Sequence, residues 1–487
     1  MSNFIQYIKG NIRLISGRQN KNVLYVYLDV NGRKKKDNIN YRKRIYKIKE
    51  SDVIFMLIIL TELIIQILSI KKIFLIEYGF SKITLKINGI GEKNIFCFNS
   101  TLYKREYYPN EVYINGNKQN ILNYSYYFNQ TENDVELLWN NSINDAQYMF
   151  NECPDIVMID ASKFDTSILK NTSHMFKNCV SLTILNLSNF NTSKVNNIQS
   201  MFEGCSALKS LDLSYIDTSE AIMIDRMFSK CSSLASINVS HFNTSKATDF
   251  EYLFSGCELL TSLDISNFDT SHSRQIYGMF SNCVKLNSLN ISNFVTSNVK
   301  YMHNMFANCS SLTSLDLSNF NTSSLKNMHS MFSDCSSLIS LNISNFDTSL
   351  VTNFKNMFYE CSKLTSLDLS NFNTSNAIKM NNMFDGCIKL QYINLQNFNE
   401  NNLNESFAYD IFNKVPDNIV ICINTNNSLL FAEITKKKCY AIDCSNDWQI
   451  IQNKINNETG DCIHSCYGKY EYNEYNEKCY DNCRNGA

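Results

Sequence analysis

Proline is scarce in this sequence, and an excess of charge of either sign is missing. Only three of the 487 residues are proline and 44% are hydrophobic, so the composition excludes a largely disordered chain. The formal net charge of -1 excludes the global basic field that nucleic-acid binding needs. The length suits two to four ordinary domains, or one long repeat array with attachments.

Catalytic and cofactor motifs are also missing. The chain has no glycine-rich phosphate loop, no Ser/His/Asp order and no H-E-x-x-H zinc motif, and five of its six histidines are scattered among repeat surfaces. We therefore expect no enzyme activity, no catalytic residue, no metal and no cofactor.

The first 50 residues are strongly basic, and an apolar segment follows them. This segment, VIFMLIILTELIIQILSI, runs from Val53 to Ile70 and is just long enough to span a bilayer. Glu62 near its middle costs a lipid-facing helix about 2.5–3.5 kcal/mol. We expect a signal anchor that keeps the basic tail in the cytoplasm and the rest of the chain outside. A cleaved signal sequence, with translation from near Met56, and a buried helix of a soluble protein are the alternatives.

Ten cysteines recur at one spacing of 26 residues, without any insertion between them. They are Cys153, Cys179, Cys205, Cys231, Cys257, Cys283, Cys309, Cys335, Cys361 and Cys387. A period of this length signals a solenoid, and its constancy predicts that every coil has the same contour.

Each cysteine is followed by the pattern L-x-x-L-x-L-x-x-F, as in Leu312, Leu315, Leu317 and Phe320 after Cys309. The short L-x-L core alternates as a strand does, so stacked coils should form a parallel sheet. The phenylalanines should form an internal aromatic column. They are Phe190, Phe242, Phe268, Phe294, Phe320, Phe346 and Phe372.

The second half of each repeat begins with Thr-Ser, as at Thr322-Ser323. Apolar residues then follow at helical spacing, which predicts that each coil returns through a short helix or 3₁₀ turn. A Thr or Ser hydroxyl at this place would cap the start of that helix.

The recurring elements Met-Phe-x-x-Cys, Leu-x-x-Leu-(Asp/Asn)-(Leu/Ile)-Ser-x-Phe and (Asp/Asn)-Thr-Ser resemble those of the BspA-type leucine-rich-repeat surface proteins. The resemblance is to the branch with the mycoplasma-lipoprotein-like 26-residue repeat, and it covers about 149–398. It implies an exported protein used in adhesion or recognition, without implying a particular ligand. Glu400-Asn401 replaces Thr-Ser in the last copy, so we expect the array to end there.

The ten repeat cysteines are predicted to be buried, reduced and apolar in role. Side chains in register on stacked coils point the same way and stay about 4.8 Å apart, whereas a disulfide needs about 3.5–4.5 Å between Cβ atoms. None of them has the close cysteine or histidine neighbours of a metal site or the basic setting of a reactive thiol.

The exposed strand face is the candidate ligand site. Seven residues after each cysteine, Asp and Asn alternate through all ten coils, and Ser usually stands two residues earlier. The alternation separates like charges and lets each Asn donate to an adjacent Asp. Duplication of a two-coil unit would produce the same alternation. The face could bind a protein, a glycan or a mineral surface, or it could be a solvated face without a ligand. The candidate residues are Asp212, Asp264, Asn290, Asp316, Asn342, Asp368, Ser262, Ser314 and Ser366.

His303 and His329 occupy equivalent positions in adjacent coils. They could hold a metal between them, but a plain surface pair is the favoured interpretation. Before the array, Asn88-Gly89 and Asn115-Gly116 are hairpin-turn signals and predict a small β-rich cap on the first coil. After it, VPDNIVICINT reads as a terminal strand that caps the other end.

Six cysteines crowd into the tail, which predicts a disulfide module in an exported chain. They are Cys439, Cys444, Cys462, Cys466, Cys479 and Cys483. The stretch YEYNEKCYDNC is similar to a growth-factor-receptor-type cysteine-rich repeat, and we expect Cys462 to pair with Cys479 and Cys466 with Cys483. A structural zinc site is the alternative in a reducing compartment.

The sequence thus predicts an α/β solenoid: a leucine-rich-repeat array with a parallel β-sheet face, a β-rich N-terminal cap and a cysteine-rich C-terminal module. We expect a cell-surface protein, with extracellular repeats, that binds a protein or glycan ligand and no nucleic acid. It would be attached to the membrane by its N-terminal anchor, or else secreted. Sequons from Asn99 to Asn457, and none before the apolar segment, are compatible with export. A surface spacer and an intracellular scaffold are the alternatives. The expected segments are a basic tail at 1–50, an anchor at 51–72, the cap at 73–148, the solenoid at 149–401, a second cap at 402–438 and the disulfide module at 439–487.

Overall fold

The computed structural model describes residues 81–97, 102–424 and 426–456, with short stretches at 23–26, 46–49, 459, 461–463, 473–475 and 478–480. The chain divides into two compact units, 1–80 and 81–487. In the first unit, β1 (Val23–Val26) pairs antiparallel with β2 (Tyr46–Lys49). The anchor predicted at 53–70 lies outside the described residues. Among the residues that are described, no helix has the length and apolar character needed to cross a bilayer.

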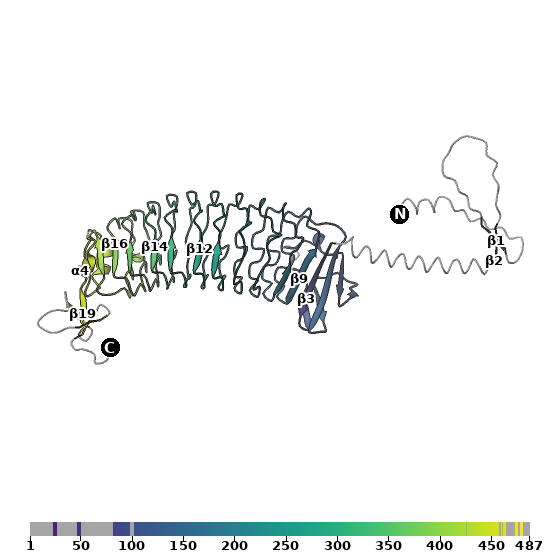
Figure 1. The fold of residues 1–487 in the computed structure, drawn as a ribbon, viewed down its shortest axis with the longest axis horizontal. Coiled ribbons are helices and arrows are strands. Elements are labelled where there is room, and N and C mark those ends of the chain that lie inside the picture. Colours follow the sequence, from purple (N-terminus) through teal and green to yellow (C-terminus); the bar gives the residue numbers. More distant parts are fainter. Residues whose placement is uncertain are drawn as a thin grey trace, which may run out of the picture. The chain divides into compact units, whose positions relative to one another are not determined.

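The second unit begins with the β-rich cap that the sequence predicted. β3 (Ser81–Asn88) pairs antiparallel with β8 (Glu132–Trp139) on one side and with β9 (Ile156–Lys163), the strand of the first coil, on the other. One sheet therefore joins the cap to the array and covers the first coil (Figure 1). The remaining cap elements are β4 (Gly91–Asn94), η1 (Arg105–Tyr107), β5 (Glu111–Ile114), β6 (Asn117–Lys118) and β7 (Ser125–Phe128).

One of the two predicted Asn-Gly hairpin turns is confirmed. Asn115 and Gly116 have φ angles of 47° and 78° and connect the antiparallel strands β5 and β6, as a type I′ turn requires. Asn88-Gly89 also turns the chain, but β4 beyond it pairs with β7. The second hairpin prediction is wrong because β8 and β9 already occupy both edges of β3.

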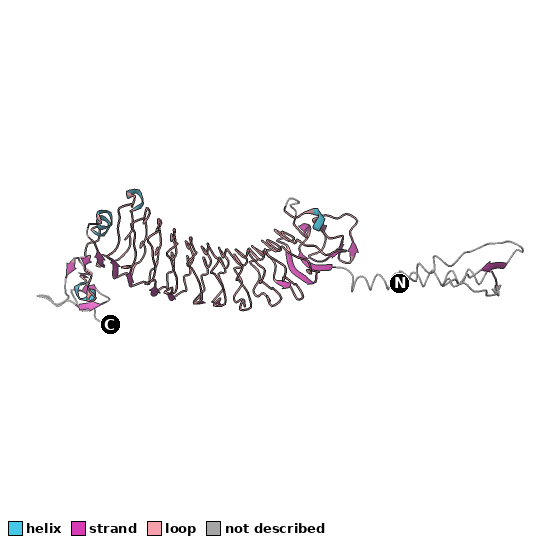
Figure 2. Ribbon diagram, turned by 90° about the horizontal axis from the view of Figure 1, so that it is seen from above, coloured by secondary structure: helices cyan, strands magenta, loops and turns pink. Residues whose placement is uncertain are grey.

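The array is the predicted solenoid, with parallel strands along one side of the stacked coils (Figures 1 and 2). Strand partners keep the repeat register, so that Ser262 faces Ser288 and Ser314 faces Ser340. The strands after β9 are β10 (Ile184–Asn186), β11 (Ser262–Asp264), β12 (Ser288–Asn290), β13 (Ser314–Asp316), β14 (Ser340–Asn342), β15 (Ser366–Asp368) and β16 (Tyr392–Leu395).

The strands pair two by two, and the pairs follow the alternation of Asp and Asn. β9–β10, β11–β12, β13–β14 and β15–β16 each join a coil with Asp to the following coil with Asn. In two of these pairs the Leu317 amide donates to the Asn342 carbonyl at 2.9 Å, and the Ile265 amide donates to the Asn290 carbonyl at 3.2 Å. The two-coil unit in the sequence is therefore also a unit of strand pairing.

The second half of each coil is a run of turns. The sequence predicts a short helix or 3₁₀ turn there, but the coils at 149–401 contain no helix of either kind and only single turns closed three residues back, as from Ala307 to Asn304 at 3.1 Å. The residues five and one before the cysteine have positive φ, as at Asn304 (57°) and Asn308 (60°). A left-handed residue in every turn cannot belong to a right-handed helix. Alternate amides bond to the next coil: Phe306 donates to the Met331 carbonyl and Asn308 to the Ser333 carbonyl, at 3.0 and 2.7 Å.

The threonine at the start of this half links coils, so the predicted helix-capping role is wrong. The Thr192 hydroxyl donates to the Asp217 carbonyl and accepts from the Asp217 amide, both in the next coil, at 2.8 and 2.7 Å. With no helix beginning here, the buried hydroxyl satisfies the backbone of its neighbour in the stack.

Two phenylalanine columns run through the core. The predicted column is present, with Phe346, Phe372 and Phe398 stacked at 6.4 Å between ring centroids. A second column, three residues before each cysteine, extends from Phe150 to Phe412, and its successive rings lie 5.5 to 6.2 Å apart. Stacking of identical rings at the coil spacing gives every coil the same interior.

One further coil follows residue 401, so the expected end of the array at Glu400-Asn401 is wrong. The strand predicted after it is confirmed, but it is not the last one. β17 (Val420–Ile423) pairs in parallel with β16, and β18 (Ala441–Ile442) pairs with β17. Val415 takes the place of the cysteine, because its amide donates to Phe412 as that of Cys387 donates to Phe384. The other C-terminal elements are η2 (Glu405–Phe407), α3 (Ser428–Ile434), α4 (Trp448–Ile451), β19 (Lys454–Asn456), β20 (Cys462–Ile463), β21 (Asn473–Tyr475) and β22 (Lys478–Tyr480).

Two disulfides join this C-terminal region, Cys422–Cys444 and Cys439–Cys462. Disulfide bonding of Cys439, Cys444 and Cys462 is confirmed. The expected Cys462–Cys479 bond is wrong, because Cys462 is bonded to Cys439 instead. Cys422 was not expected to take part; pairing of β17 with β18 brings its strand beside the chain that leads to Cys444. The side chains of Cys466, Cys479 and Cys483 lie outside the described residues, and the Cys466–Cys483 bond stays a prediction.

Candidate binding surfaces of the solenoid

The repeat cysteines are core residues, and they do more than fill space. All ten are buried and free of disulfides. From Cys179 to Cys387, each thiol donates to the carbonyl of the second-column phenylalanine in the preceding coil, at 3.1 to 3.2 Å. Burial raises the pKa of the Cys309 thiol to about 12, so the reactive thiolate is not populated near neutral pH.

The predicted ligand face is exposed and regular. In β11, β13 and β15 the Ser and Asp side chains are exposed and the Leu between them is buried. The Asn residues of β12 and β14 are exposed in the same way. The structure therefore places the nine candidate residues in two outward columns along the array. They are Asp212, Asp264, Asn290, Asp316, Asn342, Asp368, Ser262, Ser314 and Ser366.

The Asp and Asn side chains on this face also turn the chain. Asp264 Oδ1 accepts the amide of Ser266 at 3.1 Å, and Asn290 does the same for Ser292 at 3.3 Å. The Ser266 amide, then its hydroxyl, and also the Asn290 side chain hold the pKa of Asp264 below its usual value. Asp264 thus keeps its charge at neutral pH, and one of its carboxylate oxygens is used for the turn.

An aromatic pair closes the face at its C-terminal end. Tyr392 takes the position of the serine column, and its ring stacks on Trp448 of α4 at 5.0 Å between centroids. These rings are partly exposed. The column of serines is therefore followed by a stacked aromatic pair. In the sequence, only Tyr392 indicated this pair.

The return side of the coils, which we define as the residues between the core phenylalanine and the next cysteine, carries a different surface. Tyr277, His303 and His329 stack there in three successive coils, at 4.4 and 4.6 Å between centroids. Burial, and then His329, lowers the pKa of His303 to about 4, so this imidazole is neutral at pH 7. The described residues contain no cluster of His, Cys, Asp or Glu that could hold a metal.

Acidic residues and their partners occupy the earlier coils on the same side. Arg226 Nη2 lies 2.5 Å from Glu251 Oε1, and its guanidinium lies 4.5 Å from the Tyr252 ring centroid. Asp249 accepts from Gln275 at 3.1 Å, and burial raises its pKa to about 7. Arg226 is paired with Glu251 and Asp249 is hydrogen-bonded to Gln275, so these residues form a structural network of the stack.

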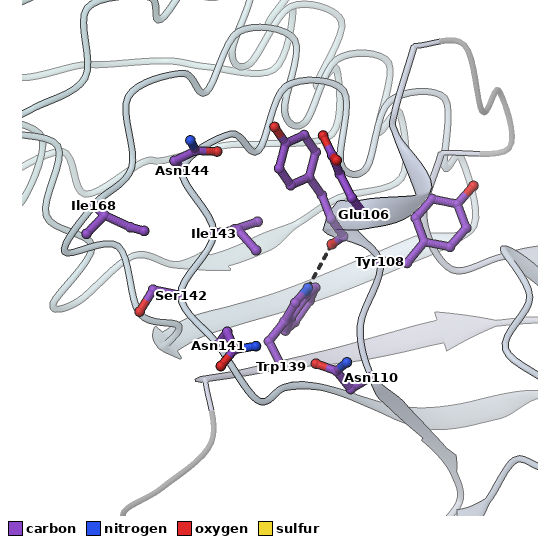
Figure 3. Close-up of a pocket in the computed structure, with 10 residues that line it drawn as sticks. Glu106, Tyr108, Asn110, Trp139, Asn141, Ser142, Ile143, Asn144 and Ile168 are labelled. Carbon is purple, nitrogen blue, oxygen red and sulfur yellow. Dashed lines mark hydrogen bonds between the residues drawn. The ribbon is translucent and has the colours of Figure 1, made fainter.

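A pocket of about 480 Å³ lies between the cap and the first coils (Figure 3). Trp139 forms its floor and donates from Nε1 to the Tyr107 carbonyl at 2.8 Å. Glu106 is the one carboxylate among the lining residues, which also include Asn144 and Ile168. The lining offers hydrogen-bonding groups, among them the phenols of Tyr107 and Tyr108.

Sequence comparisons identify the repeat. The family model described as "Mycoplasma protein of unknown function, DUF285" matches at residues 119–237, 144–263, 223–340 and 311–417, together more than half of the chain. No curated protein matches the sequence. A solved structure described as "Crystal structure of TLR13-ssRNA13 complex" is 17% identical, over 56% of this chain and 49% of that chain, with a TM-score of 0.21. The chain spans about half the length of that protein.

Proposed function

The chain belongs to this family, described as Mycoplasma protein of unknown function, DUF285, with BspA-like leucine-rich repeats, and we propose that it is a cell-surface recognition protein. Its solenoid would present the ligand-binding face outside the cell, with a protein or a glycan as ligand. The N-terminal segment at 53–70 would attach it to the membrane. No enzyme activity is part of this proposal.

The observation that carries the proposal is the pair of exposed Ser and Asp/Asn columns. They repeat at one register over successive coils, as in β11 and β13, and a surface of this kind suits an extended ligand better than a small molecule. The Asp carboxylates remain charged. Two C-terminal disulfides support an oxidising compartment, because such bonds are rare in the cytosol.

The location is tested by treating intact cells with protease or with an antibody against the array. The proposal expects cleavage or labelling without permeabilisation. Access only after permeabilisation would contradict it and would favour an intracellular scaffold.

The ligand face is tested with a glycan and matrix-protein binding screen of the full chain. In the variant D264N/D316N/D368N the three charges are lost while the turns remain, because Asn already forms this turn at Asn290. The proposal expects at least tenfold weaker binding of whatever ligand the screen identifies. The matched control is D217N/D269N/D347N, three Asp residues that form the same turn on another column. Equal losses in both variants would contradict a site on the strand face.

A surface spacer without a specific ligand is the second candidate, and one observation favours it. Much of the polar surface is used to join coils: Asn293 donates to the Ser266 carbonyl and Asn345 to the Ser318 carbonyl, at 2.7 and 2.6 Å. A spacer would be accessible on intact cells and would bind nothing in the screen.

A further inference from the structure

Three cations stand in consecutive coils on the return side of the array. Arg274, Lys300 and Lys326 each lie nine residues before a cysteine, and all three are exposed. The Lys300 amide donates to the Arg274 carbonyl and the Lys326 amide to the Lys300 carbonyl, both at 3.0 Å. The three side chains therefore start from directly adjacent backbones, about 4.8 Å apart.

These cations are not neutralised by acidic side chains of the described chain. The ion pairs of the array involve other residues, such as Lys177 with Glu203 and Lys246 with Glu220. Like charges on neighbouring strands destabilise a sheet. The strand face avoids this by placing Asn between Asp residues, whereas the column of Arg274, Lys300 and Lys326 has no neutral residue between its charges. An anion bound from outside would relieve the repulsion.

Lys355 and Lys379 extend this positive surface into the next two coils. They stand six and eight residues before a cysteine, on columns beside that of Arg274, Lys300 and Lys326. The Thr352 amide donates to the Lys326 carbonyl and the Lys379 amide to the Thr352 carbonyl, at 3.1 and 3.3 Å. The charges of Lys355 and Lys379 add to burial in holding the pKa of His329 below its usual value. Lys379 also sits over the Phe407 ring at 4.7 Å. We define the basic strip as Arg274, Lys300, Lys326, Lys355 and Lys379, one cation in each of five coils, over about 19 Å.

The neighbouring aromatic residues limit the kinds of ligand that fit. Tyr277, His303 and His329 stack on one another, so most ring faces are covered and cannot stack on nucleic-acid bases. Tight protein interfaces use aromatic anchors in pockets, whereas Arg274, Lys300 and Lys326 are exposed. A flat row of cations with hydrogen-bond donors suits a polymer that carries an anionic group on each unit.

We propose that the basic strip binds a linear anionic polysaccharide, whose sulfate or carboxylate groups pair with Arg274, Lys300, Lys326, Lys355 and Lys379. The guanidinium of Arg274 can hold an oxyanion through two parallel hydrogen bonds, and the lysines act as point charges. This site lies on a different column of the coil from the strand face. It does not depend on the surface-recognition proposal or on where the protein resides.

The test uses the purified full chain and measures binding of heparin, hyaluronan and neutral dextran at 50 and 200 mM NaCl. The proposal expects binding of at least one anionic polymer and none of dextran, and weaker binding at the higher salt because charge pairs release counterions. Binding of heparin alone assigns sulfate as the recognised group. Binding of both polymers shows that carboxylate suffices.

The variant R274Q/K300Q/K326Q is expected to bind at least tenfold more weakly and to lose much of the salt dependence. The control is K285Q/K363Q/K389Q, which removes the same charge from three exposed lysines two residues after a cysteine. The D264N/D316N/D368N variant should bind the polymer like the natural chain, which separates this site from the strand face.

Three results would overturn the proposal. They are no binding of either anionic polymer by the natural chain, an equal loss in the control variant, and tighter binding of single-stranded poly(dT) than of both polysaccharides. Circular dichroism of each variant checks that the fold is kept, as expected for exposed side chains that form no ion pair.

Discussion

Cysteine has opposite roles in the array and in the C-terminal region. In the array, every coil holds one buried thiol, and from Cys179 onward each thiol donates to a carbonyl of the coil before it, as Cys309 does to Phe280 at 3.2 Å. In the C-terminal region, Cys422, Cys439, Cys444 and Cys462 form two disulfides.

The difference comes from geometry. Translation by one coil keeps all thiols parallel and gives each one the same carbonyl acceptor, so none of them has a single preferred thiol partner. After β17 the regular translation ends, and residues distant in the sequence approach from different directions. Spacing along the chain therefore identifies the array cysteines as core, whereas the pairing in the tail depends on the fold.

The largest effect is expected from removing a disulfide. Replacing Cys439 and Cys462 with serine should destabilise the C-terminal region by about 2–4 kcal/mol, because the open chain gains entropy. Hydrogen exchange would show faster exchange in α3 and β17 and unchanged exchange in β11 to β14. A reducing agent also breaks Cys422–Cys444 and should therefore loosen the same region of the natural chain at least as much. If the array loosened as much as the tail, the contrast between the two regions would not hold.

A single array cysteine should matter less. Cys309→Ala removes a thiol donor and leaves a small cavity, which should cost about 1–2 kcal/mol. Cys309→Ser keeps a donor toward the Phe280 carbonyl and should recover part of the loss. Local hydrogen exchange of the neighbouring coils measures both variants. A greater loss with serine than with alanine would show that the thiol contributes as an apolar group only.

A buried acid gives the array a dependence on pH. Asp249→Asn should stabilise the protein by about 1–2 kcal/mol at pH 8, after allowance for its partial exposure. Because burial raises the folded pKa of Asp249 to about 7, the natural chain is favoured at low pH and loses this stability as the pH rises from about 4 through 7. Asn fits, since Asn327 occupies the equivalent position. Urea unfolding at pH 8 and at pH 4 measures the difference in free energy of unfolding between the variant and the natural chain. This difference should vanish at pH 4.

The smallest effect is expected on the strand face. Asp264→Asn should leave global unfolding unchanged, because the amide of Ser266 keeps an acceptor. Asp264→Ala removes that acceptor and should speed exchange of the Ser266 amide. Exchange that is equally fast in both variants would mean that the turn does not depend on the side chain.

Much of the array could be predicted from the sequence because one interior is repeated. The spacing of cysteine, leucine and phenylalanine gives the coil length, the strand and the buried side chains, as at Cys309, Leu315 and Phe320. The return path could not be predicted from apolar spacing, because residues three or four apart can face a core without forming a helix. Asn, Gly or Asp before many of the cysteines, as at Asn308, was a signal for positive φ that apolar spacing did not use.

The candidate sites were predictable in part. The exposure of the Ser and Asp columns follows from strand alternation. Their use in turns, the Tyr392–Trp448 stack and the basic strip depend on which residues meet across coils or across the end of the array. Those contacts are set by the stacking register rather than by any local pattern.

The central claim is that the repeat cysteines are hydrogen-bond donors of the core and that recognition belongs to the surface. The most direct test alkylates native and unfolded protein under non-reducing conditions and identifies the labelled peptides by mass spectrometry. The account predicts that all ten array cysteines, from Cys153 to Cys387, stay unlabelled in the native protein at pH 8 and take up one label each on unfolding. Cys422, Cys439, Cys444 and Cys462 should be recovered as two disulfides. Labelling of array cysteines in the native protein, or disulfides between coils, would contradict it.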